Sequence, residues 1–345
     1  MEVTIRKPDT EKPDAALLRE AYELASEVYD MEPWIDFIEE QVLAIEFADG
    51  ARRFLSVMGR FGTHFAVALY PDMGTYWRIR SIREDDEADA LDAFMSTHQL
   101  QLVFCRAADL MKGERASIKA SGVKFPRGVN PSFVSYMPGF APDAMGAGEM
   151  REALRFIRAF FGFRKDHMSF AVRPLNSPHD LISTWAEGAD GSWTFHEDEF
   201  AGMLPVAVSV DNSLISKVAA LKTNVKMFLE VGVYPVPVGR TPSGRGKMSK
   251  VVLLVDHESH LALTVNVFET PDDRETDWAP MLDFALETML KGGFRPGRIA
   301  TNNSQMGAVL GNLCASNFAG TEYVPHATCS AANEVFDMIS SRMFR

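Results

Sequence analysis

The chain has 345 residues, enough for about two domains, and its 46% hydrophobic and 24% charged residues are typical of a globular protein. A formal net charge of −12 argues against broad, non-specific binding to nucleic acid or anionic membranes, which needs a basic surface. No apolar run could span a bilayer, and the N-terminus lacks a signal-peptide pattern. The three cysteines are widely spaced, which argues against a disulfide framework. We therefore expect a cytoplasmic protein.

The first half of the chain begins with a predicted helix from about Asp14 to Asp30. Asp14 is a suitable N-cap, and apolar residues recur at helical spacing after it. Three strand-like runs follow, at Val42–Phe47, Phe54–Met58 and Phe65–Tyr70. The glycine-containing turns between these runs predict a short antiparallel meander.

The next elements alternate between acidic, apolar and proline-rich segments. Acidic residues at Glu84–Asp92 favour the opening of a solvated helix, because acids are stabilised near a helix N-terminus. Leu100–Cys105 reads as a strand, and Glu149–Phe163 as a helix with aromatic residues on its buried side. Phe125–Pro142 contains four prolines and little periodicity, so we predict an ordered loop there.

A domain boundary is predicted between Asp166 and Pro205, where the pattern weakens. This boundary gives domains at 1–198 and 205–345. The elements predicted around it are a hairpin of Ile182–Ala186 and Ser192–Phe195, a strand at Val206–Val210 and a helix from Asn212.

The C-terminal third has the clearest pattern, in which three strands precede alternating helices and strands. We expect a mixed five-stranded sheet whose first three strands are antiparallel and whose last two run parallel through helical crossovers. The predicted elements are strands Met227–Val238, Val251–Val255 and Leu261–Phe268, helix Asp277–Lys291, strand Arg298–Thr301, helix Ser304–Asn317, strand Glu322–Val324 and helix Ala331–Met343.

The order of these elements resembles the ribonuclease H-like fold of integrases and transposases. The resemblance covers about Lys226 to Arg345. Lys250–Phe268 looks like the second and third strands of integrases, and Phe294–Ser304 looks like their later strand with an Asp-Asn-Gly turn. The predicted fold class is therefore an α+β N-terminal domain followed by an α/β, ribonuclease H-like C-terminal domain.

The same resemblance implies where a nuclease would hold two divalent metals. In that family one acid lies on the first strand, where Glu230 could stand, and another ends the fourth strand, where this chain has Asn302. Glu287 and Asp337 are the possible helix acids. Asparagine supplies only a neutral oxygen, a poor ligand for magnesium, so a degenerate site is expected.

The whole chain also resembles a group of bacterial proteins with two adjoining domains of unknown function. This likeness implies a shared fold and no activity. The residues that carry it are Tyr22–Ala25, Pro33–Trp34, Val57–Gly62 running into Phe65–Tyr70, Ser135–Pro142, Leu253–Asp256 and Gly293–Pro296.

One loop collects positive charge without any acid. Arg240, Arg245, Lys247 and Lys250 lie in or beside the glycine-containing segment between two predicted strands. The segment lacks the Lys-Ser/Thr pair of a P-loop and does not open a helix. A flexible basic hairpin that contacts an anionic partner is one interpretation, and a solvated loop is the other.

Other polar clusters favour structural roles. His257 and His260 lie three residues apart in a predicted turn, which suits no usual metal spacing, and no third ligand can be named. Cys314 lies on the apolar face of a helix and is expected in the core. We therefore expect no bound metal.

Together these patterns favour a non-catalytic binding or regulatory protein whose partner is another protein. The alternative is a metal-dependent nuclease or phosphodiesterase that uses Glu230, Glu287 and Asp337 with magnesium. Otherwise no cofactor and no membrane contact are expected. Nucleic acid would bind only through the Arg240–Lys250 loop, and the oligomeric state is left open.

Overall fold

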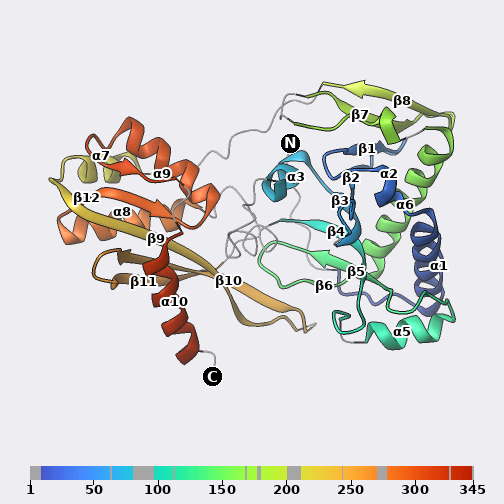
Figure 1. Ribbon diagram of the computed structural model, residues 1–345, viewed down its shortest axis with the longest axis horizontal. Helices are drawn as coiled ribbons and strands as arrows, with labels where there is room; N and C mark the ends of the chain where they lie inside the picture. The colour runs from blue at the N-terminus through green and yellow to red at the C-terminus, as the bar shows by residue number, and fades with distance from the viewer. Residues whose placement is uncertain are drawn as a thin grey trace.

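The strands of the molecule form two separate sheets, one of eight strands and one of five (Figure 1). The computed structural model describes residues 9–343 except 63, 81–96, 112, 168, 177–179, 200–210, 243, 270–277 and 326–327. Strands up to Asp198 belong to the first sheet, and strands from Thr223 onward belong to the second. The predicted helix at Glu84–Asp92 and strand at Val206–Val210 lie outside the described residues.

The first domain is built on the larger sheet, whose strand order is β6-β5-β4-β3-β2-β1-β7-β8. Neighbouring strands are antiparallel except β1 and β7, which run parallel. The elements are α1 (Ala15–Met31), α2 (Pro33–Asp36), β1 (Leu43–Glu46), β2 (Arg52–Met58), β3 (Phe65–Tyr70), α3 (Met73–Arg80), β4 (Gln99–Cys105), α5 (Glu114–Ser121), β5 (Asn130–Tyr136), β6 (Asp143–Ala144), α6 (Ala147–Asp166), β7 (Ile182–Glu187) and β8 (Trp193–Asp198).

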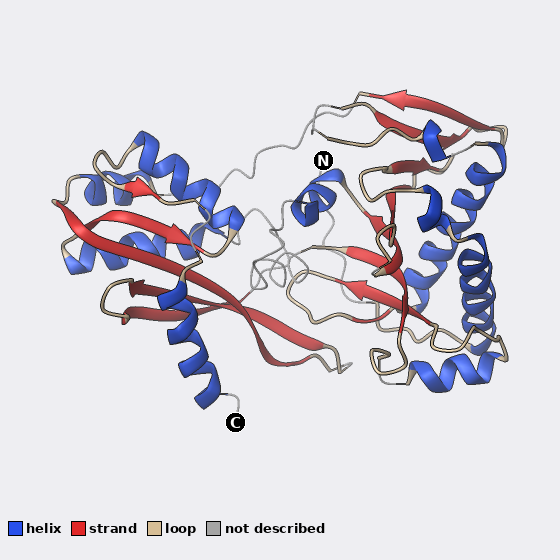
Figure 2. Ribbon diagram, viewed as in Figure 1, coloured by secondary structure: helices blue, strands red, loops and turns tan. Residues whose placement is uncertain are grey.

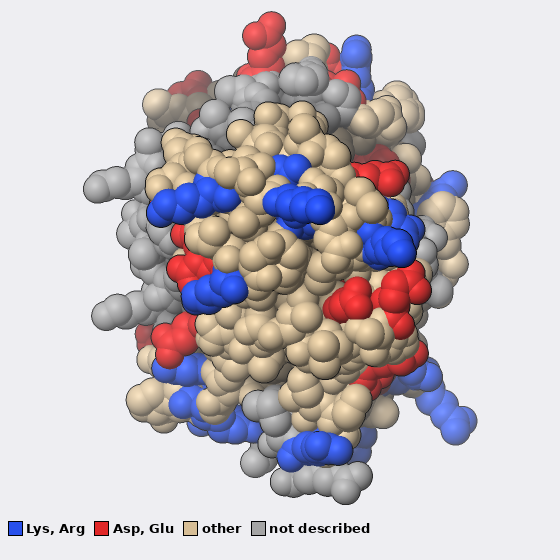
Figure 3. All heavy atoms as spheres, turned by 90° about the vertical axis from the view of Figure 1, so that its left-hand side faces the viewer, with Lys and Arg blue, Asp and Glu red and all other residues tan. Residues whose placement is uncertain are grey.

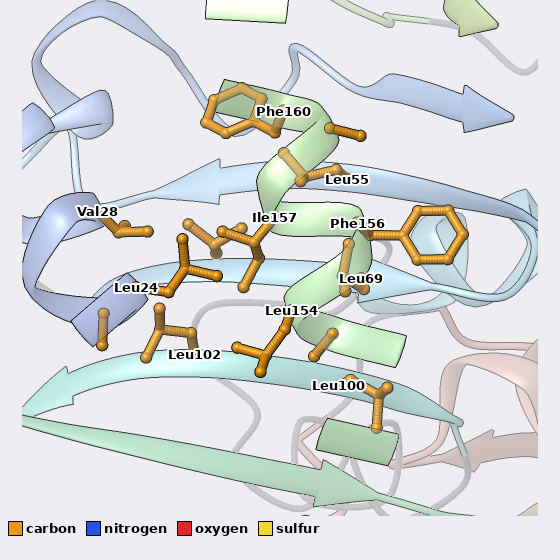
Figure 4. Close-up of a cluster of buried hydrophobic side chains, with 14 of the residues drawn as sticks. Leu24, Val28, Leu55, Leu69, Leu100, Leu102, Leu154, Phe156, Ile157 and Phe160 are labelled. Atoms are coloured by element: carbon orange, nitrogen blue, oxygen red, sulfur yellow. The ribbon is translucent and has the colours of Figure 1, made fainter. Parts of the chain in front are cut away.

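Helices α1 and α6 cover one face of this sheet (Figure 2). Helix α1 begins where predicted, because the Asp14 side chain accepts a hydrogen bond from the Leu17 N–H at 2.8 Å. Figure 4 shows side chains of both helices pointing onto the strands, where they bury the largest hydrophobic cluster among the described residues. The labelled side chains are Leu24 and Val28 of α1, Leu154, Phe156, Ile157 and Phe160 of α6, and Leu55, Leu69, Leu100 and Leu102 of the strands.

The prediction of a loop throughout Phe125–Pro142 was wrong, because β5 lies inside it. Ser132 and Ser135 are buried in this strand and interrupt its apolar pattern. Their hydroxyls donate to the buried carboxylates of Glu114 and Glu149, at 2.8 Å each. The burial of both serines therefore depends on acids elsewhere in the chain, which the local pattern does not show.

The second domain contains the predicted mixed five-stranded sheet, in the order β11-β10-β9-β12-β13. Strands β9, β10 and β11 are antiparallel, while β12 and β13 run parallel to β9. The elements are α7 (Asn212–Ala219), β9 (Thr223–Arg240), β10 (Gly246–Asp256), β11 (Leu261–Glu269), α8 (Trp278–Gly292), β12 (Arg295–Thr301), α9 (Ser304–Ser316), β13 (Glu322–Tyr323) and α10 (Ser330–Met343).

Helices cover both faces of this second sheet. Residues of α7, α8 and α9 pack with Leu229 and Val231 of β9 on one face. Residues of α10 pack with Phe228 and Tyr234 on the other, which follows from the alternation of side chains along a strand. Figure 1 shows α10 lying across the strands, apart from the other three helices.

Candidate functional site

Glu230, the first acid of the nuclease alternative, is buried in the middle of β9 with only 1% of its surface exposed. One carboxylate oxygen lies 2.5 Å from Nδ1 of His257, and the other accepts the Ala332 N–H at 2.7 Å. Because Ala332 lies in the first turn of α10, the carboxylate satisfies a backbone N–H that has no partner within the helix. Glu230 therefore anchors α10 to the sheet.

Asn302, at the position of the second acid, joins two strands. Its side-chain oxygen accepts the Val233 N–H at 2.8 Å, and its side-chain nitrogen donates to the Val233 carbonyl at 3.3 Å. An amide can donate and accept at once, whereas a carboxylate can only accept. Asparagine thus extends the pairing of β12 with β9 in a way that an ionised acid could not.

The remaining acids of the nuclease alternative lie elsewhere. Glu287 is exposed on α8, where it pairs with Lys291 at 2.8 Å, and α8 covers the sheet face opposite Glu230. Asp337 is exposed on α10. Nowhere in the described part of the chain do three His, Cys, Asp or Glu side chains converge as a metal site would require. The structure does not bring Glu230, Glu287 and Asp337 together.

The two histidines of the β10–β11 turn also separate. His257 pairs with Glu230, whereas Nδ1 of His260 lies 2.8 Å from a carboxylate oxygen of Glu334 on α10. Each histidine therefore contacts a different carboxylate, and the two contacts bind the β10–β11 turn to β9 and to α10.

The basic loop is not a free hairpin, because Arg245 is 5% exposed and docks on the first domain. Its guanidinium donates to the carbonyls of Ser135 at 2.7 Å and Ala141 at 3.1 Å, and to the Ser135 hydroxyl at 3.4 Å. Two backbone hydrogen bonds join the same segments, from Ala141 N–H to Gly246 and from Met248 N–H to Gly139, both at 2.9 Å. The predicted mobile loop is therefore a contact between domains.

The other three cations of that loop differ in exposure. Arg240 is exposed and donates to the Gly244 carbonyl within its own turn, and Lys247 is also exposed. Lys250 is buried, with its ammonium 4.2 Å from the centre of the Trp278 ring. Only Arg240 and Lys247 are placed to meet a partner.

Figure 3 shows the end of the molecule formed by the second domain, on the left in Figure 1. Lysines and arginines alternate with acids around a broad uncharged area on this face. A nucleic-acid surface would instead gather positive charge in one patch or stripe.

A groove on the first domain has a volume of about 740 Å³. Most of its lining residues belong to α6, and the others come from α1, from Phe47 and from the β7–β8 hairpin. Its lining residues are Leu17, Glu20, Phe47, Arg151, Leu154, Arg155, Arg158, Ala159, Gly162, Asp166, Trp185 and Trp193.

Three aromatic rings line this α6 groove. Trp185 and Trp193 stack with centroids 5.4 Å apart and planes 19° apart, and Phe47 meets Trp193 edge-on at 5.4 Å. Trp185 is buried, whereas Trp193 is partly exposed. The rings are held in place by this stacking, so they offer a preformed apolar surface.

Three arginines of α6 form the charged rim. Residues 151, 155 and 158 share one face of the helix because their spacing is four and then three residues. Each pairs with one acid of another segment: Arg151 with Glu11 at 3.9 Å, Arg155 with Asp49 at 2.8 Å and Arg158 with Glu20 at 2.6 Å. The hydrogen bond from Arg155 lowers the pKa of Asp49, which shows that the pair favours the ionised carboxylate.

Sequence reasoning did not find this groove. The helix at Glu149–Phe163 was predicted, and the spacing of its arginines was a readable signal. The tryptophans, however, lie in the β7–β8 hairpin, and only the parallel pairing of β7 with β1 brings that hairpin against the helix.

Comparison with known families gives a match for each half of the chain. Residues 19–167 match a family described as a domain of unknown function (DUF7309), and residues 214–339 match another so described (DUF6930). This is a two-domain protein of unknown function. No curated protein matches it. None of the described helices has the length and hydrophobicity needed to cross a membrane.

Proposed function

We propose that the protein is a non-catalytic binding protein that holds a segment of another protein in the α6 groove. The observation that carries this proposal is the combination of a stacked tryptophan pair and a row of arginines around one hollow. Tryptophan and arginine are the residues most often found at the energetic centres of protein interfaces. An apolar centre beside a charged rim is also the usual anatomy of such interfaces.

The chemistry of the groove favours binding over catalysis. Its described lining contains no Ser, Thr, Cys, His, Lys or Tyr, so it offers neither a usual nucleophile nor an imidazole base. Arg158 binds Glu20, one of its two acids, in an ion pair. The groove can therefore hold a ligand but has little with which to transform it.

The partner segment should carry an aromatic or large apolar side chain next to acidic ones. The apolar side chain would meet Trp193, and the acids would meet the arginines. A guanidinium has five N–H donors, and each rim arginine pairs with one acid among the described residues, so donors remain for a partner. Exposed ion pairs of this kind contribute little to stability, so replacing them by ion pairs with a partner's carboxylate should cost little free energy.

The test reverses charge on the rim. Arg151 and Arg158 are each about half-exposed, so the double variant Arg151→Glu/Arg158→Glu should fold as the wild type does. Full-length protein is used to capture partners from an extract, and affinity for the purified partner is then measured. We expect the variant to bind at least about tenfold more weakly, the effect of losing an interface centre.

The matched control reverses two exposed charges away from the groove, as Arg106→Glu/Lys217→Glu. This variant should keep wild-type affinity for the same purified partner. The pair Arg240→Ala/Lys247→Ala tests in parallel whether the exposed cations of the β9–β10 hairpin contribute. Equal affinity of the wild type and the groove variant would overturn the proposal.

A further inference from the structure

Strand β11 is an edge of the second sheet with unusual composition. Among the described strands it pairs only with β10, so one side of its backbone faces outward. From Leu261 to Phe268 it carries no charged residue and no proline. Natural edge strands are usually protected by charges, prolines or bulges against pairing with another chain. The register shift in this pair leaves one extra residue, Leu263, on β11, so a bulge lies near the start of the strand and Thr264–Phe268 follows in regular register.

Exposed apolar side chains cluster at this edge. Leu261 is 60% exposed, Val265 49% and Val267 47%, and Met338 of α10 is 54% exposed. Register places Val265 beside Leu253 and Val267 beside Val251, so both valines lie on the face that α10 covers only in part. Contiguous exposed apolar surface of this kind marks interaction sites.

Helix α10 carries Met338 on the same side of the sheet. The contact of Glu334 with His260 shows that this side of α10 faces the β10–β11 turn. Met338 follows Glu334 by four residues and therefore lies on the same side, one turn further along. Val265, Val267 and Met338 are therefore exposed apolar side chains on the same side of the second sheet.

We propose that this edge pairs with β11 of a second copy of the chain, antiparallel across a two-fold axis. A strand rotated about an axis normal to its sheet lies antiparallel to itself, so one edge supplies both halves of the interface. With Val265 on the axis, Thr264 faces Asn266 of the other copy, and regular pairing ends at the bulge where Leu263 would meet Val267. The two five-stranded sheets then form one continuous sheet.

The distribution of charge favours a second copy of the chain as the partner that pairs with β11. No like charges meet along the paired strands, because Glu269 is the only charged residue in β11. Residues 226–345 contain 11 Lys/Arg and 13 Asp/Glu, a net charge of −2, so most of the −12 lies in the rest of the chain. Two copies therefore repel each other least through their second domains.

One outward backbone group is already satisfied within the strand. The Val267 N–H donates to the side-chain oxygen of Asn266 at 2.9 Å instead of to a strand. Rotation of the Asn266 side chain would release this N–H to a carbonyl of the second copy, so this one group has a partner in both the monomer and the dimer.

Sedimentation of full-length protein between about 1 and 100 µM tests the pairing. We expect a concentration-dependent dimer in the wild type, and a monomer at every concentration for Val265→Lys, because two ammonium groups would then meet at the axis. The control Val225→Lys replaces a valine that is 77% exposed on β9, and it should dimerise as the wild type does. A monomeric wild type, or a Val265→Lys variant that dimerises normally, overturns the proposal.

A disulfide tests the register. Facing residues of antiparallel strands have Cα atoms about 4.5–5.5 Å apart, within disulfide range. Val265→Cys should therefore form a dimer held by a disulfide under mild oxidation. Leu261→Cys should not, because its counterpart would lie about 25 Å away at roughly 3.3 Å per residue. Equal cross-linking of both variants would contradict pairing centred on Val265.

Discussion

At the scale of single residues, the first domain depends on carboxylates buried beside serines. Glu114 accepts the Ser132 hydroxyl at 2.8 and 2.9 Å and the Met111 N–H at 2.8 Å. Burial raises the pKa of this carboxyl, and its hydrogen bonds lower the pKa by less. The fold therefore disfavours the ionised form of Glu114.

Replacing Glu114 by glutamine should make stability less dependent on pH. The pKa of Glu114 is higher in the folded than in the unfolded chain. The protonated carboxyl therefore stabilises the fold fully below about pH 4.5, the unfolded pKa, and this stabilisation is lost as the pH rises through the folded pKa. We expect the free energy of unfolding of the wild type, relative to Glu114→Gln, to fall between pH 4 and 7 in urea titrations. If the difference in free energy of unfolding between the two proteins stayed constant across this range, the raised pKa of Glu114 would be contradicted.

These buried contacts also mark the limit of prediction at this scale. The cap at Asp14 and the loop charges were readable because they depend on neighbours in sequence. The burial of Ser132 depends on Glu114, and that of Arg245 on Ser135 and Ala141, which lie over 100 residues away in the chain. No local pattern shows that a cation in a glycine-containing turn will meet three oxygens of another domain.

At the scale of elements, the second domain was predicted nearly whole. Each of its strands or helices has its own periodicity, and short connections restrict how they can pair. The ribonuclease H-like assignment remains a resemblance. Strand β5 was missed because prolines and buried serines mask its pattern, and the eight-stranded sheet was larger than the meander expected.

The packing of α10 on β9 depends on the absence of a side chain at Gly232. A Cβ there would lie 2.6 Å from the Tyr234 ring and 3.0 Å from the Ala332 Cβ. The Tyr234 ring stacks on Phe336 of α10 with centroids 4.0 Å apart and donates to Asn333 at 2.6 Å, so it cannot move freely.

Gly232→Ala should therefore destabilise the protein by about 1–3 kcal/mol in urea titrations, as overpacking does. The control is Gly162→Ala in α6, where a Cβ would meet nothing within 4 Å. Alanine is the better helix former by about 0.5–1 kcal/mol, so this variant should be slightly more stable. A Gly232→Ala variant as stable as the wild type would show that α10 can shift to accommodate the methyl group.

At the scale of the whole molecule, none of the hydrophobic clusters formed by described residues includes both domains. The domains meet instead through Arg245 and the short backbone pairing of Gly139–Ala141 with Gly246–Met248. Glu149 of α6 takes part, because it accepts the hydroxyl of Ser135, which Arg245 also contacts.

Arg245→Ala should separate the unfolding of the two domains. It leaves the carbonyls of Ser135 and Ala141 buried without their donor, at a cost of about 1–3 kcal/mol for each unsatisfied group. Calorimetry should then resolve two transitions, with the first domain melting at a lower temperature. Arg240→Ala removes a neighbouring exposed arginine and should leave the profile unchanged. An unaltered profile for Arg245→Ala would mean that the backbone pairing alone joins the domains.

The pairing of Phe140 with Lys247 also bears on whether the two domains can be produced as separate fragments. Strand β11 ends opposite Ser249, and Gly139–Ala141 continues along the same side of β10 from there. The first domain thus supplies the last piece of an edge in the second domain's sheet. A fragment cut between the sheets would carry the Met248 N–H and the Arg245 guanidinium without these partners. The two domains are therefore not freely exchangeable with domains of other proteins. Each would need a new partner domain that supplies a matching loop.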